Sequence, residues 1–343
     1  MTQTLLKVRD LSVVLPADPL QKTSRDGQIL STINLTLNRG DRLGLVGESG
    51  SGKSMTALAL MGLLPPQMSM SGTIELAGQN LAMLPEQQLC AIRGRRMAMI
   101  FQEPMTALNP IKTIGAQVSE GRRLHFGENR SDAEKTARSL LDRVGLHGAR
   151  FGLELYPHQL SGGQRQRVMI AMALACEPEV LIADEPTTAL DVTVQAQILD
   201  LLDELIDESG TALLLITHDL GVVSQMTDRI AVMYAGRVVE TGETQDVFHQ
   251  MAHPYTRGLF AASPHSLSLL PAPADLSKRQ RLTAIAGVVP DPFSRLEQCN
   301  FADRCGLVQS DCRKSVPALA DAQTGNASHQ VACLHPFTDE VLR

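Results

Sequence analysis

Two stretches of the chain have the residues of a phosphate-binding loop, although they lie far apart in the sequence. The first reads GESGSGKS over residues 47–54, and the second reads LSGGQ over residues 160–164. Each places glycines at the expected start of a helix, where free backbone N–H groups and the helix dipole favour an anion. One nucleotide does not need two such loops, so the second requires a separate explanation.

The first stretch matches the P-loop pattern G-x-x-x-x-G-K-[ST]. An apolar strand at residues 43–46 precedes it and a helix rich in Ala, Leu and Met follows, which is the context that the pattern requires. We expect Lys53 to neutralise the β- and γ-phosphates of ATP or GTP, and Ser54 to hold Mg²⁺. The residues predicted to bind phosphate are Gly47, Glu48, Ser49, Gly50, Ser51, Gly52, Lys53 and Ser54.

The ends of two apolar strands carry the other candidate catalytic groups. Residues 180–183 are continuously apolar, as in a strand covered on both faces, and Asp184 follows them as an expected Mg²⁺ ligand. Glu185 is either a surface acid or, beside that aspartate, a general base that orients the attacking water. His218 ends the strand TALLLITHD, where open α/β sheets place their ligands, so we expect it to contact the γ-phosphate.

Composition limits the class of protein. The chain has 343 residues, of which 43% are hydrophobic, and a formal net charge of −6. This charge argues against a protein that coats duplex nucleic acid, which needs surplus Lys and Arg. No apolar run is long enough to cross a bilayer, and the start MTQTLLKVRD lacks the layout of a secretory signal. We therefore expect a soluble cytosolic protein.

The elements that must position these groups follow an α/β pattern. Strand-like segments lie at residues 6–15 and 31–37, ahead of the P-loop. Helical spacing at residues 131–146 predicts a helix with Ser131 as N-cap and Glu134 three residues later. No internal repeat is visible, which indicates a single nucleotide-binding module.

In this order, the motifs resemble those of the nucleotide-binding subunits of ABC transporters, over about residues 5–262. The resemblance adds Gln102 in FQEP as the Q-loop, LSGGQ as the signature and ALD at residues 189–191 as the D-loop. It implies a P-loop NTPase core of the ABC type with an antiparallel β subdomain. A helical subdomain would be inserted at about residues 103–160, and a small extension would occupy residues 263–343.

The family's architecture explains the second phosphate loop. Two subunits pack head to tail, so the signature of one closes over the ATP held by the partner subunit's Lys53. The implied signature contacts are Ser161, Gly162, Gly163 and Gln164, with Asp191 from the D-loop. The implied catalytic set is Glu185, His218 and Gln102, and the implied Mg²⁺ ligands are Ser54, Gln102 and Asp184. The chain would work as a dimer with itself or with a sister subunit.

A finer resemblance is to the ATPases of oligopeptide, dipeptide, nickel and opine-type importers, through IFQEPMTALNP and HPYTRGL. It implies two membrane permease subunits, an extracytoplasmic solute-binding protein and a peripheral position on the cytoplasmic face of the inner membrane. The choice between peptide, nickel and opine stays open, with peptide preferred. An ABC ATPase acting on ribosomes or DNA usually has two modules or a coiled-coil insert, and intact Lys53, Glu185 and His218 disfavour a non-catalytic subunit.

One departure from the family concerns adenine. ABC ATPases usually stack the base on an early aromatic residue, but no Phe, Tyr or Trp precedes Phe101 here. Aromatic stacking contributes about 1–3 kcal/mol per base in nucleic-acid binders. We expect an aliphatic contact from Leu15 to replace it.

The tail contains four of the six cysteines: Cys299, Cys305, Cys312 and Cys333. Cys90 and Cys176 lie in the ATPase body, where we expect ordinary buried residues. Disulfides are disfavoured in a reducing cytosol, and no C-x-x-C pair of the kind that zinc favours is present. The spacing resembles the cysteine set of peptide-importer ATPases, some of which bind a 4Fe–4S cluster, so we predict such a cluster. Zinc with His329 or His335, or scattered cysteines, are the alternatives.

Overall fold

The computed structural model describes residues 4–17, 25–148, 150–188, 190–263, 284–295, 297–322 and 328–337. They form two compact units. Unit 1 comprises Met1–Leu6, Thr36–Asp41 and Glu75–Ile216, and unit 2 comprises Lys7–Leu35, Arg42–Ile74 and Thr217–Arg343. Among the described residues, no helix has the length and apolar character needed to cross a membrane. The first part of the predicted extension, residues 264–283, lies outside the described residues.

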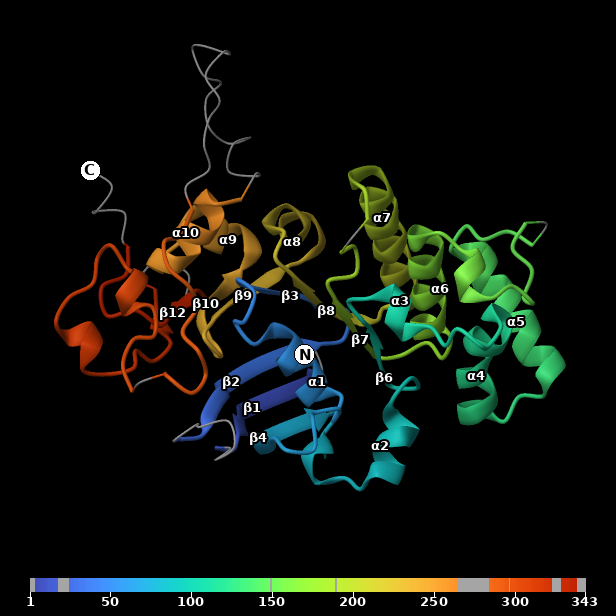
Figure 1. The fold of residues 1–343 in the computed structure, drawn as a ribbon, viewed down its shortest axis with the longest axis horizontal. Helices are drawn as coiled ribbons and strands as arrows, with labels where there is room; N and C mark the ends of the chain where they lie inside the picture. Colours follow the sequence, from blue (N-terminus) through green and yellow to red (C-terminus); the bar gives the residue numbers. More distant parts are fainter. Residues whose placement is uncertain are drawn as a thin grey trace, which may run out of the picture. The chain divides into compact units, whose positions relative to one another are not determined.

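The sheet of unit 2 begins with the strand that leads into the P-loop (Figure 1). Strand β3 (Arg42–Val46) runs parallel to β9 (Arg229–Tyr234), and β10 (Arg237–Glu243) pairs antiparallel with β9. The tail then adds β12 (Gln330–Val331) to β10, and β11 (Ala320–Asp321) to β12. Residues far apart in the chain therefore share one sheet.

The helices of unit 2 are short. They are α1 (Lys53–Leu60) after the P-loop, α8 (Leu220–Met226), α9 (Thr244–His249) and α10 (Pro254–Ala261). In the described part of the tail, the 3₁₀ turns η4 (Ala302–Arg304) and η5 (Asp311–Arg313) accompany its two strands. The described tail residues are therefore mostly irregular.

In unit 1, the predicted carboxylate-bearing strand is the buried centre of a parallel sheet. Strand β7 (Val180–Asp184) pairs with β6 (Met97–Ile100) on one side and with β8 (Ala212–Thr217) on the other. Every residue of β7 is buried. Helix α6 (Gly162–Leu174) packs on β6 and on α7 (Val192–Ser209). This sheet fixes the place where the β7 carboxylates emerge.

Helices follow β6 in the chain, where the sequence predicted a helical insert. They are α3 (Pro104–Ala107), α4 (Ile114–Phe126) and α5 (Arg130–Arg143), with the 3₁₀ turn η3 (Pro157–Gln159) before α6. The predicted start of α5 was wrong. Asn129 is the N-cap and accepts a hydrogen bond from the Asp132 N–H, while Ser131 lies inside the first turn. Asn is as favourable an N-cap as Ser, and the helix begins after Asn129, two residues before Ser131.

A four-stranded sheet holds the early strands in the order β2-β1-β4-β5, with β4 and β5 antiparallel. Strands β1 (Thr4–Leu15) and β2 (Gly27–Asn38) contain the two predicted segments, and β4 (Ser69–Leu76) and β5 (Gln79–Asn80) complete the sheet. The 3₁₀ turn η2 (Leu81–Met83) and helix α2 (Glu86–Ile92) follow.

The tail is attached to unit 2 by packing and by one buried polar pair. Phe301 is 4% exposed, and its ring centre lies 5.2 Å from that of Tyr234 and 5.4 Å from that of Tyr255. Glu240 and His329 are both fully buried, with 2.8 Å between Glu240 Oε1 and His329 Nε2. The Glu240 carboxylate also accepts hydrogen bonds from the N–H groups of Ala252 and His253. These contacts give the tail the anchor that its own few apolar residues do not supply.

The buried pair makes a stability prediction. Replacing Glu240 with Ala removes every one of these hydrogen bonds, so that His329 Nε2 and the N–H groups of Ala252 and His253 lose a buried carboxylate partner. We expect the free energy of unfolding to fall by about 3–5 kcal/mol, measured by urea denaturation. Glu243 is exposed on the same strand, so Glu243→Ala serves as the control and should change stability by less than about 0.5 kcal/mol. Equal effects of the two substitutions would contradict an anchoring role for the pair.

Candidate nucleotide-binding site

The P-loop adopts a conformation that two of its glycines make possible. Gly47 has φ 154°, and a Cβ there would lie 2.2 Å from the Met233 carbonyl oxygen. Gly52, the residue before α1, has φ 107°, and a Cβ there would lie 2.7 Å from Leu30. Any other residue would clash or be strained at these positions. The glycine pattern in the sequence therefore reports a real steric requirement.

Lys53 lies inside the curl of this loop. It is the first residue of α1 and is 6% exposed. Its ammonium donates hydrogen bonds to the carbonyl oxygens of Gly47, at 2.7 Å, and Glu48, at 3.1 Å. A buried positive charge beside the N-terminus of a helix is suited to phosphate oxygens. Ser54 follows it and is exposed.

In unit 1, the predicted general base is held by two side chains. Gln102 Nε2 donates to Glu185 Oε2 at 3.0 Å, and Thr188 Oγ1 donates to the same oxygen at 2.8 Å. The Glu185 N–H donates to the Ile216 carbonyl oxygen, and the residue has φ 46°. Such a conformation is costly for a residue other than glycine and is typical of functional sites. The carboxylate is thus fixed in direction at the end of β7, next to buried Asp184.

Thr188 is a site residue that the motif search missed. The sequence does contain a signal, because a hydroxyl residue three positions after an acid can reach back to it within one turn. The Thr188 N–H also donates to the Glu185 carbonyl oxygen, at 3.2 Å, which closes that turn.

The signature starts helix α6 with a capping box. The Ser161 hydroxyl accepts from the Gln164 N–H, and Gln164 Oε1 accepts from the Ser161 N–H at 2.9 Å. Gly162 and Gly163 are then the first two helical residues. Asp191 caps α7 in the same way, accepting from the Val194 N–H at 3.0 Å. A Cβ on Gly163 would lie 2.8 Å from Val194 Cγ1, so the starts of the two helices adjoin.

The remaining predicted residues lie in unit 2. His218 is exposed and directly follows β8, and the next residue, Asp219, caps α8. Leu15 is the last residue of β1 and is half-buried. Unit 2 therefore carries the P-loop, His218 and Leu15, whereas unit 1 carries Gln102, the β7 carboxylates and the signature. Ala189 of the D-loop lies outside the described residues.

Comparison with known proteins identifies the family. A family model described as ABC transporter matches residues 30–188, and one described as the C-terminal region of oligopeptide/dipeptide transporters matches residues 239–312. A probable peptide ABC transporter ATP-binding protein of Sinorhizobium fredii is 45% identical over 94% of this chain and 93% of the relative. A protein of Brucella melitensis, provisionally named as a peptide import ATP-binding protein, is 44% identical over 97% of both chains. The chain belongs to the ABC transporter ATP-binding proteins, in the oligopeptide and dipeptide branch.

Solved structures agree with this assignment. A dimeric ATP-binding cassette in a post-hydrolysis state, bound to ADP and Pi, is 28% identical and has a TM-score of 0.62. The match covers 70% of this chain and 99% of the cassette. A cassette from Clostridium perfringens, part of an ABC transporter complex, is 29% identical with a TM-score of 0.58, over 73% of this chain and 92% of the other. The predicted α/β ABC-type fold and ATPase activity are confirmed. An ABC ATPase uses ATP as its nucleotide and Mg²⁺ as its metal ion.

The predicted iron–sulfur cluster was wrong. The matching family models, relatives and structures describe a plain ABC ATPase and name no cluster. The four tail cysteines do line one cavity, but it measures about 20 Å³, room for about one water molecule. Burial raises the pKa of Cys333 to about 11, and it also raises the pKa values of Cys299 and Cys305.

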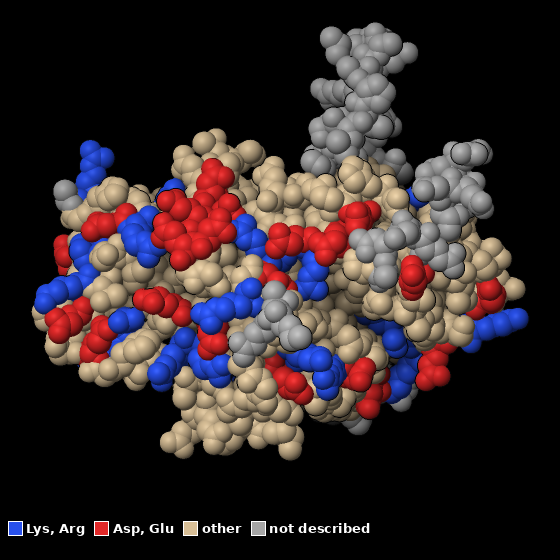
Figure 2. Space-filling model, turned by 180° about the vertical axis from the view of Figure 1, so that it is seen from behind, with Lys and Arg blue, Asp and Glu red and all other residues tan. Residues whose placement is uncertain are grey.

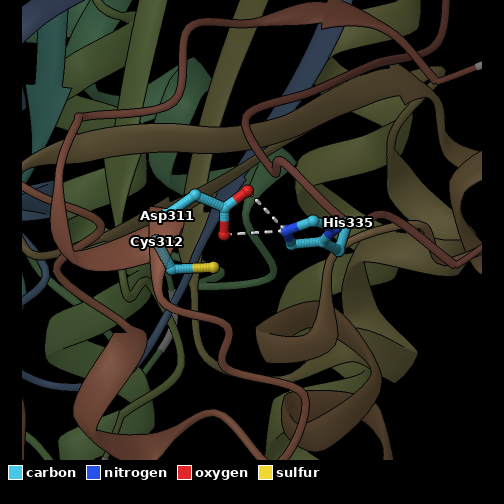
Figure 3. A group of neighbouring side chains, drawn as sticks. All are labelled: Asp311, Cys312 and His335. Carbon is cyan, nitrogen blue, oxygen red and sulfur yellow. Dashed lines mark hydrogen bonds and ion pairs between the residues drawn. The ribbon is translucent and has the colours of Figure 1, made fainter.

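The two histidines of the zinc alternative lie in different surroundings. His329 is occupied by Glu240 in the interior. His335 Nε2 lies 2.9 Å from both carboxylate oxygens of Asp311, and Cys312 lies beside this pair (Figure 3). Ligand atoms of these three residues lie within 4.8 Å of one another, and sulfur, nitrogen and oxygen are all donors that zinc accepts. The predicted alternative, zinc held by tail cysteines with His329 or His335, did not include Asp311 and stays a prediction, and the Asp311–His335 ion pair accounts for this grouping without a metal.

The two glycines that begin α6 differ in how much space a Cβ atom would find. A Cβ on Gly163 meets Val194 at 2.8 Å, whereas one on Gly162 is 3.7 Å from its nearest neighbour, Leu190. We expect Gly163→Ala to lower the free energy of unfolding by about 1–3 kcal/mol through overpacking. Gly162→Ala should raise it by about 0.5–1 kcal/mol through helix propensity.

Thermal and urea denaturation of both variants measure the difference. Val194→Ala in the Gly163→Ala background should restore most of the lost stability, because it removes the clashing atom. If Gly162→Ala and Gly163→Ala are equally stable, the close approach of α6 and α7 has no energetic consequence.

Proposed function

We propose that this chain is the ATP-hydrolysing subunit of an ABC importer that takes up di- or oligopeptides. The observation that carries the proposal is the Glu185 carboxylate, fixed by Gln102 and Thr188 at the end of the buried strand β7. The names of the relatives and the matched C-terminal region support peptide as the solute. Import of nickel, an opine or another small solute would use the same residues, because the solute does not contact this chain.

The proposed chemistry assigns each group one task. Lys53 and the P-loop N–H groups bind the phosphates, and Ser54, Asp184 and Gln102 hold the Mg²⁺ ion through hydroxyl, carboxylate and amide oxygens. The bound Mg²⁺ supplies positive charge near the β- and γ-phosphates. Glu185 accepts a proton from the water that attacks the γ-phosphorus, and the bond to the bridging oxygen breaks to give ADP and Pi. His218 donates a hydrogen bond to the γ-phosphate.

The signature and D-loop serve a second subunit in this proposal. The N–H groups of Gly162 and Gly163 stand at the N-terminus of α6, a site that favours an anion, and Ser161 is exposed beside them. They would close over the ATP of a second ABC ATPase subunit packed head to tail, with Gln164 and Asp191 at the same interface. Solved relatives include a dimeric cassette, which supports this arrangement.

The other proposed partners are two membrane permease subunits and an extracytoplasmic solute-binding protein. The chain would then lie peripherally on the cytoplasmic face of the inner membrane. A role on nucleic acid or ribosomes is the weaker candidate. On the face in Figure 2, Lys and Arg side chains are interspersed with Asp and Glu and do not form one basic surface.

The role of Glu185 is tested by a charge-neutral substitution. Glu185→Gln removes the proton acceptor and keeps the shape, so we expect ATP turnover in the assembled transporter to fall at least about 100-fold while ATP binding is retained. Lys53→Ala is the contrasting variant, because removal of the ammonium should weaken nucleotide binding itself. Near-normal turnover by Glu185→Gln would exclude Glu185 as the base.

The role of Leu15 is tested by supplying the missing aromatic ring. Leu15→Phe should tighten ATP binding by about 1 kcal/mol or more, through stacking on adenine, and should increase the preference for ATP over GTP. Competition binding with the two nucleotides measures both effects. Val14→Phe is the control, because adjacent strand residues point to opposite faces. A strict ATP preference that neither substitution changes would place the adenine contact elsewhere.

A further inference from the structure

The tail contributes one side chain to the P-loop. Arg304, in η4, donates through Nη1 to Glu48 Oε2 at 2.6 Å and through Nη2 to Glu48 Oε1 at 2.9 Å. Glu48 is the second residue of the P-loop. The Arg304 side chain is 5% exposed and that of Glu48 is 28% exposed. This two-point pair joins residues far apart in the sequence, and a partly buried pair of this geometry is stronger than an exposed one.

The guanidinium of Arg304 is fixed on its other sides as well. Its Nε donates to the Ala286 carbonyl oxygen at 2.8 Å, and Nη2 donates to the Ile285 carbonyl oxygen at 3.3 Å. Its central carbon lies 5.7 Å from the centre of the Tyr234 ring, and Nη1 lies 3.4 Å from the hydroxyl of that residue. The hydrogen bonds with Glu48 raise the pKa of Arg304 further above its usual value, so the charge is permanent. The tail thus presents a rigid, charged fork to the P-loop.

Glu48 is held at three points, and one of them is the phosphate-binding lysine. Its N–H donates to the Tyr255 hydroxyl at 2.8 Å, and its carbonyl oxygen accepts from Lys53 Nζ at 3.1 Å. Its carboxylate pairs with Arg304. A continuous set of hydrogen bonds therefore runs from the Lys53 ammonium through Glu48 to the tail.

We propose that Arg304 is a positioning residue for nucleotide binding, which neutralises Glu48 and holds the P-loop in its phosphate-binding conformation. A carboxylate in a loop that binds a triphosphate repels the ligand unless a positive charge compensates it. Arg304 supplies that charge from outside the ATPase motifs. The tail is then a part of the nucleotide site, and by reciprocity ATP binding stabilises the tail. The inference rests on the proposed role of the P-loop in binding ATP.

The test measures ATP binding to the full-length chain and ATP hydrolysis in the assembled transporter. For Arg304→Gln we expect the Kd and KM for ATP to rise about tenfold, with kcat at saturating ATP nearly unchanged, because the lost charge acts on binding. Arg304→Lys keeps the charge and should recover part of the affinity. Arg313→Gln is the matched control, because Arg313 pairs with Asp303 on the exposed part of the same tail and should leave Kd within about twofold.

A second substitution separates this role from a merely structural one. In the Glu48→Gln, Arg304→Gln double variant the repelling carboxylate is gone, so most of the lost ATP affinity should return. Loss of a tail anchor alone would not be reversed in this way. Glu48→Gln by itself should bind ATP more tightly than the unaltered chain, because the carboxylate is gone while the Arg304 charge remains. This variant carries the test if Arg304→Gln does not fold.

Three outcomes would overturn the inference: unchanged ATP affinity in Arg304→Gln, no recovery in the double variant, or a tenfold loss in Glu48→Gln alone. Absence of ATP binding by the unaltered chain would instead refute the proposed function of the P-loop. Measuring ATP binding by the unaltered chain therefore distinguishes the two failures.

Discussion

The buried ammonium of Lys53 is the interaction on which the nucleotide site depends. A charge taken out of water is costly unless polar groups surround it, and here two loop carbonyls do so. Those carbonyls can turn inward only because Gly47 and Gly52 adopt backbone conformations closed to other residues. The loop, the lysine and the helix that follows thus act together on a negative charge. Phosphate oxygens can accept hydrogen bonds from the Lys53 ammonium in place of the carbonyl oxygens or in addition to them.

The carboxylate half of the site has a different physical basis. Strand β7 is buried throughout, including Asp184 at its end, and the chain first becomes partly accessible at Glu185. Glu185 is held there in a costly conformation, and its side chain is directed by Gln102 from after β6 and by Thr188 from its own turn. Strain and double hydrogen bonding together indicate a group whose direction matters more than its contribution to stability.

The tail shows how a segment with little apolar content becomes ordered. It adds a short strand to β10, packs Phe301 against Tyr234 and Tyr255 and buries His329 against Glu240. The matched C-terminal family region begins at residue 239, inside β10. No cluster is needed to explain why the tail is ordered.

Local rules were sufficient for the P-loop, the buried strand β7 and the capped start of α6. Each depends on residues adjacent in the chain, whose steric limits, apolar runs and capping hydrogen bonds act over a few positions. Such rules do not decide between neighbouring residues with similar N-cap preference. At the start of α5 the N-cap is Asn129 and not Ser131. The pairs Gln102–Glu185, Glu48–Arg304 and Glu240–His329 were decided by tertiary structure, as was the size of the cysteine cavity. Sequence spacing carries no information about which distant side chains meet, because that depends on how sheets and helices pack once the chain has folded.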